Sequence, residues 1–162
     1  MWDFRERDKM FNIVLVHPDI PQNTGNIVRT CAATGAVLHL IKPLGFSIED
    51  KYLKRAGLDY WDEATVKVYD SFEEFEEKNP TGKRYLCTTK GSKCYCDFEF
   101  SDGDYLVFGS ETKGLPDSIH ESYPDTRIRI PMREGIRCLN LSNAVNIILF
   151  EAIRQNGFEG LI

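Results

Sequence analysis

Apolar runs of five or six residues alternate along this chain with stretches that have helical spacing. The runs are rich in β-branched and aromatic residues, which is typical of buried strands. We expect strands at residues 11–16 (FNIVLV), 37–41 (VLHLI), 64–69 (ATVKVY), 84–89 (RYLCTT), 104–109 (DYLVFG) and 127–131 (RIRIP). Strands separated by helices imply a mostly parallel sheet with helices on both faces, so the predicted fold class is α/β.

The stretches between these runs carry helix signals. Apolar residues recur every three or four positions, and small polar residues or glycine stand at the ends. We expect helices at residues 26–35 with Gly35 as the stop, from Ser47 to about Arg55, at 71–79, near 116–121, and from the NLSN segment at 140–143 onward.

The last helix is the most hydrophobic segment of the chain. Five of its apolar residues form one stripe at helical spacing: Val145, Ile148, Leu149, Ala152 and Ile153. Ile147 and Phe150 widen the apolar surface beyond what one sheet face needs. Either this helix is buried wholly within its own domain, or a second protein surface covers the excess.

Length and composition fit a single domain. The chain has 162 residues, of which 42% are hydrophobic. No apolar run approaches the roughly 20 residues that cross a bilayer, so we expect no membrane association. Residues 1–9 (MWDFRERDK) are charged where an export signal needs an apolar stretch. We therefore expect a flexible extension at 1–9 and one domain at 10–162, in the cytoplasm.

The cysteines do not suggest disulfides or a metal. Their odd number, in a chain without an export signal, favours reduced thiols. They are Cys31, Cys87, Cys94, Cys96 and Cys138. Cys94 and Cys96 lack a second Cys/His pair at ligand spacing, so we expect no metal site.

The charge of the chain is unevenly distributed. A net charge of −5 counts mildly against a nucleic acid partner, although acid is concentrated at residues 71–79. The basic residues collect elsewhere, at Arg29, 51–55, Lys113, Arg127, Arg129, Arg133 and Arg137. They fit either a locally basic face or scattered surface charges, and the sequence leaves both open.

Three loops that follow predicted strands combine glycine or proline with hydrogen-bonding side chains. They are PQNTGN at 21–26, GSETKGLP at 109–116 and PMREGIRCLNLSN at 131–143. Ligands of parallel sheets bind outside the carboxyl ends of the strands, so three such loops predict a site. GSETKG matches neither a P-loop nor a nucleophile elbow, and the dinucleotide fingerprint is missing after the first strand.

The NLSN segment contains more polar side chains than a helix start requires. One serine or asparagine is enough to cap a helix. The remaining ones either satisfy backbone groups of the loop or hold a ligand.

Three segments resemble, in order and spacing, the signature motifs of the SPOUT superfamily of RNA methyltransferases. They are NTGNIVR at 23–29, FGSETKGLP at 108–116 and IPMREGIRCLNLSNAVNIILFEA at 130–152. The resemblance runs from about residue 11 to 157 and includes KPLGF at 42–46, KRAGLDYW at 54–61 and TTKG at 88–91. The complete pattern of motifs is similar to that of the small, single-domain branch of the superfamily. This branch methylates the ribose 2′-hydroxyl of the wobble nucleotide, cytidine or a modified uridine, in certain tRNAs.

This resemblance implies a knot and a cofactor. SPOUT proteins bind S-adenosylmethionine in a C-terminal trefoil knot, a rare exception to the rule that chains do not thread loops. The matching cofactor positions are Cys87, Thr88, Gly109, Gly114, Ile130, Met132, Cys138 and Leu139. Cys87 stands where relatives often have leucine, and Cys138 where serine is usual. Either thiol packs as a small hydrophobe, or a needed serine hydroxyl is lost and cofactor affinity falls.

Arg29 is the catalytic residue that the resemblance implies. The matching arginine of the family is described as a general base, but a guanidinium holds its proton too tightly for that role. We expect Arg29 to bind a phosphate and to stabilise the forming alkoxide, while a phosphate oxygen or water takes the proton.

The resemblance also implies partners. The family forms homodimers that pair through the last helix and bring Arg29 of one subunit near the cofactor of the other. The tRNA anticodon loop is expected to contact Asn23, Arg29, Arg137 and Asn140.

Two alternatives remain beside a tRNA wobble 2′-O-methyltransferase. The first is an rRNA 2′-O-methyltransferase of the same superfamily, although such relatives often carry a separate RNA-binding domain before the catalytic one. The second is a non-catalytic RNA-binding protein that retains the knot. Such a protein is expected to lose Arg29 or the glycine-rich loops, and both are present.

Overall fold

The fold is built on one parallel β-sheet. The computed structural model describes residues 10–57 and 60–162, so the predicted extension at 1–9 lies outside the described residues. Within them the sheet has seven strands, and all neighbouring strands pair in parallel. In sheet order the strands are β3 Thr65–Tyr69, β2 Val37–Ile41, β1 Asn12–Val16, β6 Tyr105–Phe108, β4 Arg84–Cys87, β7 Arg127–Arg129 and β5 Lys93–Cys94.

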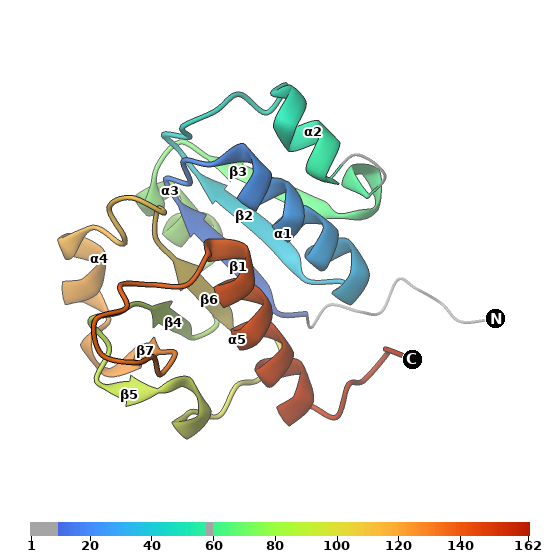
Figure 1. Cartoon of the computed structure of the whole chain (residues 1–162). Helices are drawn as coiled ribbons and strands as arrows, with labels where there is room; N and C mark the ends of the chain where they lie inside the picture. The colour runs from blue at the N-terminus through green and yellow to red at the C-terminus, as the bar shows by residue number, and fades with distance from the viewer. Residues whose placement is uncertain (1–9, 58–59) are drawn as a thin grey trace.

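Helices cover both faces of the sheet (Figure 1). α1 (Pro21–Thr34) and α5 (Leu141–Gln155) lie side by side on one face, and α3 (Phe72–Lys78) and α4 (Asp117–Ser122) lie on the other. α2 (Lys51–Gly57) packs against α1. The predicted α/β class, with a parallel sheet between helices, is confirmed. None of the described helices is both long enough and apolar enough to cross a membrane.

The central strand shows how the sequence divides the core into two layers. In β1, Ile13 and Leu15 pack in the cluster that includes α1 and α5, whereas Val14 and Val16 pack in the cluster beneath α3 and α4. All four side chains are fully buried. A strand covered on both faces is therefore a continuous apolar run, and burial of each side chain contributes roughly 1.5–3 kcal/mol.

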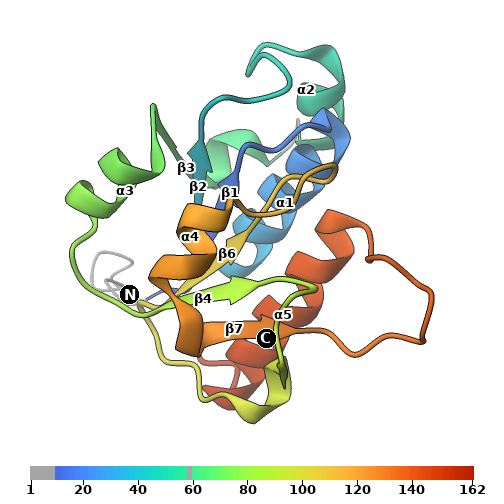
Figure 2. The same ribbon diagram turned by 90° about the vertical axis from the view of Figure 1, so that its left-hand side faces the viewer.

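The strand order determines where a ligand can bind. The chain runs outward from β1 through β2 to β3, then crosses to the other half of the sheet, where β6 lies beside β1. Open parallel sheets bind ligands at the carboxyl ends of strands near such a reversal. The ends of β4, β6 and β7 meet on this side, and Figure 2 shows the long loop between β7 and α5 projecting away from the sheet.

Helix α1 begins at Pro21, whereas the sequence analysis placed its start at residue 26. The predicted start of this helix was therefore wrong. Its N-cap residue, Ile20, has no side chain that can accept a hydrogen bond. The Glu111 carboxylate accepts instead, from the backbone N–H of Asp19 at 2.7 Å and of Ile20 at 3.2 Å. Because this acceptor lies 91 residues further along the chain, local sequence signals could not reveal it.

Helix α2 also begins elsewhere than predicted. The Ser47 hydroxyl accepts from the backbone N–H of Glu49 at 3.1 Å and forms only a local turn. The Asp50 carboxylate accepts from the backbone N–H of Tyr52 at 2.7 Å, so α2 starts at Lys51. Two capping residues compete within four positions, and the later one is used.

The strands differ from the predicted ones mainly at their ends. β4 ends at Cys87 and β7 at Arg129, each two residues before the predicted end, because the chain turns there into loops. β5 was not predicted, since a strand of two residues has no readable periodicity.

Candidate functional site

A cavity of about 570 Å³ lies at the carboxyl ends of β4, β6 and β7. Its walls come from all three sequence-predicted loops, together with the residues that follow β4. All eight residues expected to contact a cofactor line it: Cys87, Thr88, Gly109, Gly114, Ile130, Met132, Cys138 and Leu139. Asn23, Arg137 and Asn140, expected to contact RNA, line it as well. The cavity therefore collects residues as far apart in the sequence as Ile20 and Ile148.

The end of β4 forms one wall of the cavity. Burial raises the pKa of the Cys87 thiol well above its ordinary value, so this side chain stays neutral and packs as a small hydrophobe. The Thr88 hydroxyl lies 2.9 Å from His120 Nε2 and accepts from the backbone N–H of Lys90 at 3.2 Å. Burial, followed by the charges of Lys90 and Arg127, lowers the pKa of His120, so its ring is neutral at pH 7.

The loop after β6 depends on two glycines for different reasons. A Cβ at Gly109 would lie 2.2 Å from the carbonyl carbon of Gly114 and 2.3 Å from the nitrogen of Leu115, so the two ends of this loop are in close backbone contact. Gly114 has φ +68°, and its N–H donates to the Ser110 carbonyl at 3.0 Å. Gly109 thus permits a close approach of the protein's own backbone, and Gly114 permits a left-handed turn.

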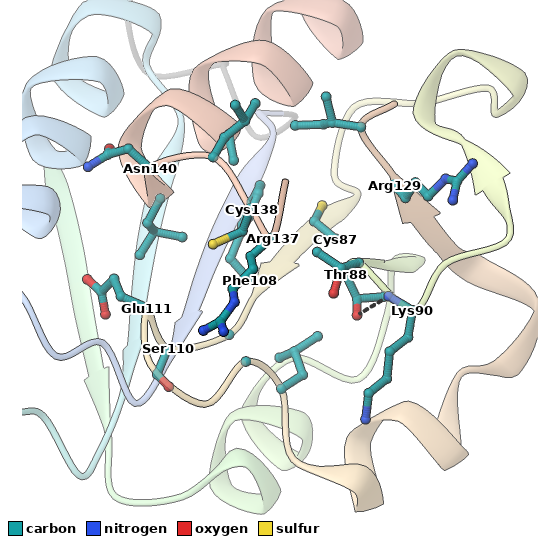
Figure 3. Close-up of a pocket in the computed structure, with 18 of the residues that line it drawn as sticks. Cys87, Thr88, Lys90, Phe108, Ser110, Glu111, Arg129, Arg137, Cys138 and Asn140 are labelled. Carbon is teal, nitrogen blue, oxygen red and sulfur yellow. Dashed lines mark hydrogen bonds between the residues drawn. The ribbon is translucent and has the colours of Figure 1, made fainter. Parts of the chain in front are cut away.

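The loop between β7 and α5 forms the outer wall. It supplies Ile130, Met132, Cys138 and Leu139, and its residues from 133 to 140 are exposed. Figure 3 shows Cys87 and Thr88 on one side of the cavity and Ser110 and Glu111 on the other, with Arg137 between them. The guanidinium of Arg137 can therefore reach an anionic group in or above the cavity.

A chain of hydrogen bonds joins the three loops. The Asn140 side chain donates from Nδ2 to Asn23 Oδ1 at 2.9 Å, and Asn23 donates from Nδ2 to Glu111 Oε1 at 3.2 Å. Asn140 also caps α5, because its Oδ1 accepts from the backbone N–H of Ser142 at 3.0 Å and from the Ser142 hydroxyl at 2.6 Å. Asn140 of NLSN thus both caps α5 and braces the loops against one another, and the Ser142 hydroxyl bonds to Asn140.

The charge around the cavity differs in sign from the charge of the whole molecule. Among the residues that line it, Lys90, Lys113, Arg129 and Arg137 are basic, and Glu111 alone is acidic. Lys90 is paired with Asp117 at 3.4 Å, at an exposed site where such a pair is weak. Lys113, Arg129 and Arg137 of the basic residues noted in the sequence thus lie around the cavity, where they favour an anionic partner.

Arg29 lies outside the cavity of its own chain. It stands on the exposed face of α1, about 1.7 turns beyond Asn23, and is not among the lining residues. The structure therefore does not bring the expected catalytic residue to the other site residues within one chain.

The exposed side of α5 lies next to α1. The predicted apolar stripe of α5 is buried as expected, while Ile147 and Phe150 remain 36% and 44% exposed. A hydrogen bond from the Thr30 hydroxyl to Asn146 Oδ1, 2.8 Å long, links the two helices. The outer faces of both helices are exposed, with Ile147 and Phe150 on α5 and Arg29 on α1.

Two residues of the site were missed by the sequence analysis. Glu111 organises the loops, and its position between the glycines of GSETKG was the signal that could have indicated it. His120 lies in a short amphipathic helix, where no sequence signal distinguishes it from a core residue. Its Nδ1 is buried and lacks a hydrogen-bond partner among the described residues.

Cys87 and Cys138 line the cavity, whereas Cys31, Cys94 and Cys96 are not among its lining residues. All five cysteines are free thiols, and the sulfur atoms of Cys94 and Cys96 are 2.6 Å apart near the edge strand β5. In the described ranges, no three or more His, Cys, Asp or Glu side chains are grouped so that they could hold a metal ion.

Comparisons with known proteins show which family the chain is similar to. Residues 10–150 match the model of the SpoU rRNA Methylase family. A curated tRNA (cytidine(34)-2′-O)-methyltransferase of Burkholderia ambifaria is 52% identical over 155 residues, which cover 93% of this chain and 99% of the relative.

Two solved structures are similar in fold to most of the chain. One, described as giving structural insights into the 2-OH methylation of C/U34 on tRNA, has a TM-score of 0.89 at 41% identity and covers 93% of this chain and 99% of its own. The AdoMet-bound rRNA methyltransferase of Sinorhizobium meliloti has a TM-score of 0.81 at 26% identity. The match covers 90% of this chain and 56% of that protein's chain. The resemblance that the sequence motifs indicated is confirmed.

Proposed function

The chain belongs to the SpoU rRNA methylase family, and we propose that it transfers a methyl group from S-adenosylmethionine to the ribose 2′-hydroxyl of the wobble nucleotide, cytidine or a modified uridine, in tRNA. The observation that carries this proposal is the end-to-end match, at 52% identity, to a tRNA (cytidine(34)-2′-O)-methyltransferase. The rRNA enzyme of S. meliloti is matched over only 56% of its length, so the comparison favours a tRNA substrate. Residues 10–162 would act as one domain, in the cytoplasm.

The cavity suits the proposed cofactor in size and character. Its volume lies within the roughly 300–1,000 Å³ of small-molecule sites. Phe108, Leu115 and Ile128 offer apolar surface for an adenine ring, while Thr88 and the exposed backbone of the last loop offer hydrogen-bonding groups. We assign cofactor contact to the eight lining residues expected from the sequence. S-adenosylmethionine supplies an electrophilic methyl group on a sulfonium.

Arg29 would act on the acceptor hydroxyl. The reaction requires the 2′-oxygen to lie in line with the methyl group and to lose its proton. Arg29 binds an RNA phosphate, and its positive charge stabilises the oxygen as the proton leaves. The proton passes to a phosphate oxygen or to water, because a guanidinium is too weak a base to accept it.

A homodimer would complete the site. Ile147 and Phe150 are exposed on α5 beside α1, and a two-fold interface over this surface would bury them. Such pairing would bring Arg29 of one copy toward the cavity of the other. The position of Arg29 outside its own cavity supports this arrangement.

The anticodon loop would contact the basic residues around the cavity. Lys90, Lys113, Arg129 and Arg137 can neutralise phosphates, which are the main source of affinity in RNA binding. Asn23 and Asn140 would contribute mainly by holding the loops, since they are hydrogen-bonded to each other. Family membership further supports a trefoil knot in the segment that follows β4.

The proposal can be tested with isotope-labelled cofactor. Purified protein is incubated with S-adenosylmethionine bearing a deuterated methyl group, and with tRNA or rRNA from a strain that lacks the activity. Mass spectrometry of nuclease digests should find a labelled 2′-O-methyl group at nucleotide 34 of tRNA. Arg29→Ala should reduce labelling by at least about 100-fold, whereas Lys67→Ala, an exposed cation on β3, should not.

The other outcomes separate the rival functions. Label in rRNA alone would establish the rRNA methyltransferase instead. Cofactor binding without label in either RNA would favour the non-catalytic protein.

A further inference from the structure

Arg29 needs a support to be effective. Its side chain is exposed on α1, and an unrestrained arginine loses considerable rotamer freedom whenever it is fixed in one orientation. The described residues provide such a support, because Arg29 Cζ lies 4.9 Å from the centroid of the Tyr60 ring.

Tyr60 is itself held in place by its neighbours. It precedes the 3₁₀ turn at Trp61–Glu63, in which the backbone N–H groups of Glu63 and Ala64 both donate to the Tyr60 carbonyl at 3.1 Å. Trp61 and Ala64 pack against the main core cluster, and the turn contacts α1. The half-buried Tyr60 is therefore anchored through its backbone beside the exposed Arg29.

An aromatic ring suits an arginine that must act on RNA. A carboxylate would neutralise the guanidinium and occupy the N–H donors that a phosphate needs. A ring face attracts the cation through its quadrupole and leaves the charge and the in-plane donors available. Among the ion pairs between described residues, none involves Arg29.

We propose that Tyr60 is a positioning residue whose ring holds the Arg29 guanidinium in the orientation required at the 2′-oxygen. This inference rests on the proposed function and deepens it. It also gives a role to the KRAGLDYW segment at 54–61, which lies outside the three cavity loops. Tyr60 itself lines no part of the cavity.

Two substitutions separate the ring from the hydroxyl. Tyr60→Leu removes the aromatic face, and kcat for tRNA methylation should fall about tenfold, whereas Tyr60→Phe should stay within about twofold of the native rate. The dissociation constant of S-adenosylmethionine should not change in either variant. Tyr52→Leu is the matched control, since Lys51 Nζ lies 5.0 Å from the exposed Tyr52 ring, and it should keep the native rate.

A double-mutant cycle distinguishes positioning from a general structural effect. In an Arg29→Ala background, Tyr60→Leu should cause no further loss of rate, because the group that it positions is gone. If the two losses instead multiply, Tyr60 acts independently of Arg29 and the inference is wrong.

Nuclear magnetic resonance gives a readout that does not depend on activity. The ring current of Tyr60 should move the δ-proton and Nε–H resonances of Arg29 upfield in the native protein and in Tyr60→Phe, and Tyr60→Leu should abolish the shift. An active native protein whose Tyr60→Leu variant keeps both its rate and the Arg29 shift overturns the inference. A native protein that fails to methylate tRNA overturns the proposed function, and with it the positioning role.

Discussion

At the scale of single residues, Glu111 replaces a helix cap that the local sequence lacks. Its carboxylate accepts from the backbone N–H groups of Asp19 and Ile20 and from the Asn23 amide. It thereby satisfies donors at the start of α1 and places a negative charge at the positive end of the helix dipole. One side chain of the β6 loop thus fixes the helix that carries Arg29.

Glu111→Gln should lower the free energy of unfolding by about 1–2 kcal/mol, because the charge at the helix start and one acceptor oxygen are lost. Urea unfolding at pH 7 measures this difference. Glu77→Gln, at an exposed position of α3, should change stability by less than about 0.5 kcal/mol. Equal effects of the two substitutions would show that Glu111 has no capping role.

His39 is a second residue whose environment has a measurable consequence. It lies on β2, and its buried ring bonds to residues of the two adjacent strands. Nδ1 is 2.9 Å from the hydroxyl of Tyr69 on β3, and Nε2 is 2.9 Å from Oδ1 of Asn12 on β1. Asn12 Oδ1 can only accept, so Nε2 carries the proton and the Tyr69 hydroxyl donates to Nδ1. Burial, followed by the charges of Lys67 and Arg84, lowers the pKa of His39 to about 3.

The protein should therefore lose stability in mild acid. The unfolded chain binds the His39 proton near pH 6.5 and the folded chain only near pH 3, so the unfolded state binds more protons between these values. The free energy of unfolding should decrease as the pH is lowered across this window, by at most about 1.4 kcal/mol per pH unit. His39→Gln should flatten the slope measured between pH 7 and 5.

A slope that His39→Gln leaves unchanged would assign the effect to another group. His120→Gln tests the main alternative, because the pKa of His120 is also lowered by burial.

At the scale of elements, the sequence could predict whatever depends on local periodicity. The central strands and the buried stripe of α5 were readable because their apolar residues recur with the period of the element. The start of α1 was not readable, because Glu111 caps it from a distant loop, and β5 was too short to show a period. The cavity residues were found through motif resemblance, whereas Glu111 and His120 act through contacts that only folding creates.

The exposed outer faces of α1 and α5 form the surface that is proposed to pair in the dimer. Ile147→Glu together with Phe150→Glu should weaken self-association, because charges would replace the apolar residues that the proposed interface buries. Sedimentation velocity should show a concentration-dependent dimer for the native protein and a monomer for the variant. Val68→Glu is the control, since Val68 is 36% exposed on β3 and lies outside this surface. A native monomer would contradict the proposed dimer.

At the scale of the whole molecule, charge and assembly are connected. The chain carries a net charge of −5, yet four basic side chains line its cavity. Local potential, not net charge, determines where an RNA docks, and two copies would place two such clusters around one anticodon loop. Because Arg29 lies outside its own cavity, the proposed active site is complete only in the dimer.

The central claim is that the acceptor is the 2′-hydroxyl of nucleotide 34. The most direct test compares two full-length tRNAs assembled by ligation, which differ only in ribose or 2′-deoxyribose at cytidine 34. Methyl transfer from S-adenosylmethionine should occur with the ribose substrate and be absent with the deoxyribose substrate, although both bind with similar affinity. Equal methylation of the two tRNAs would contradict the claim, because the methyl group would then be attached to another atom.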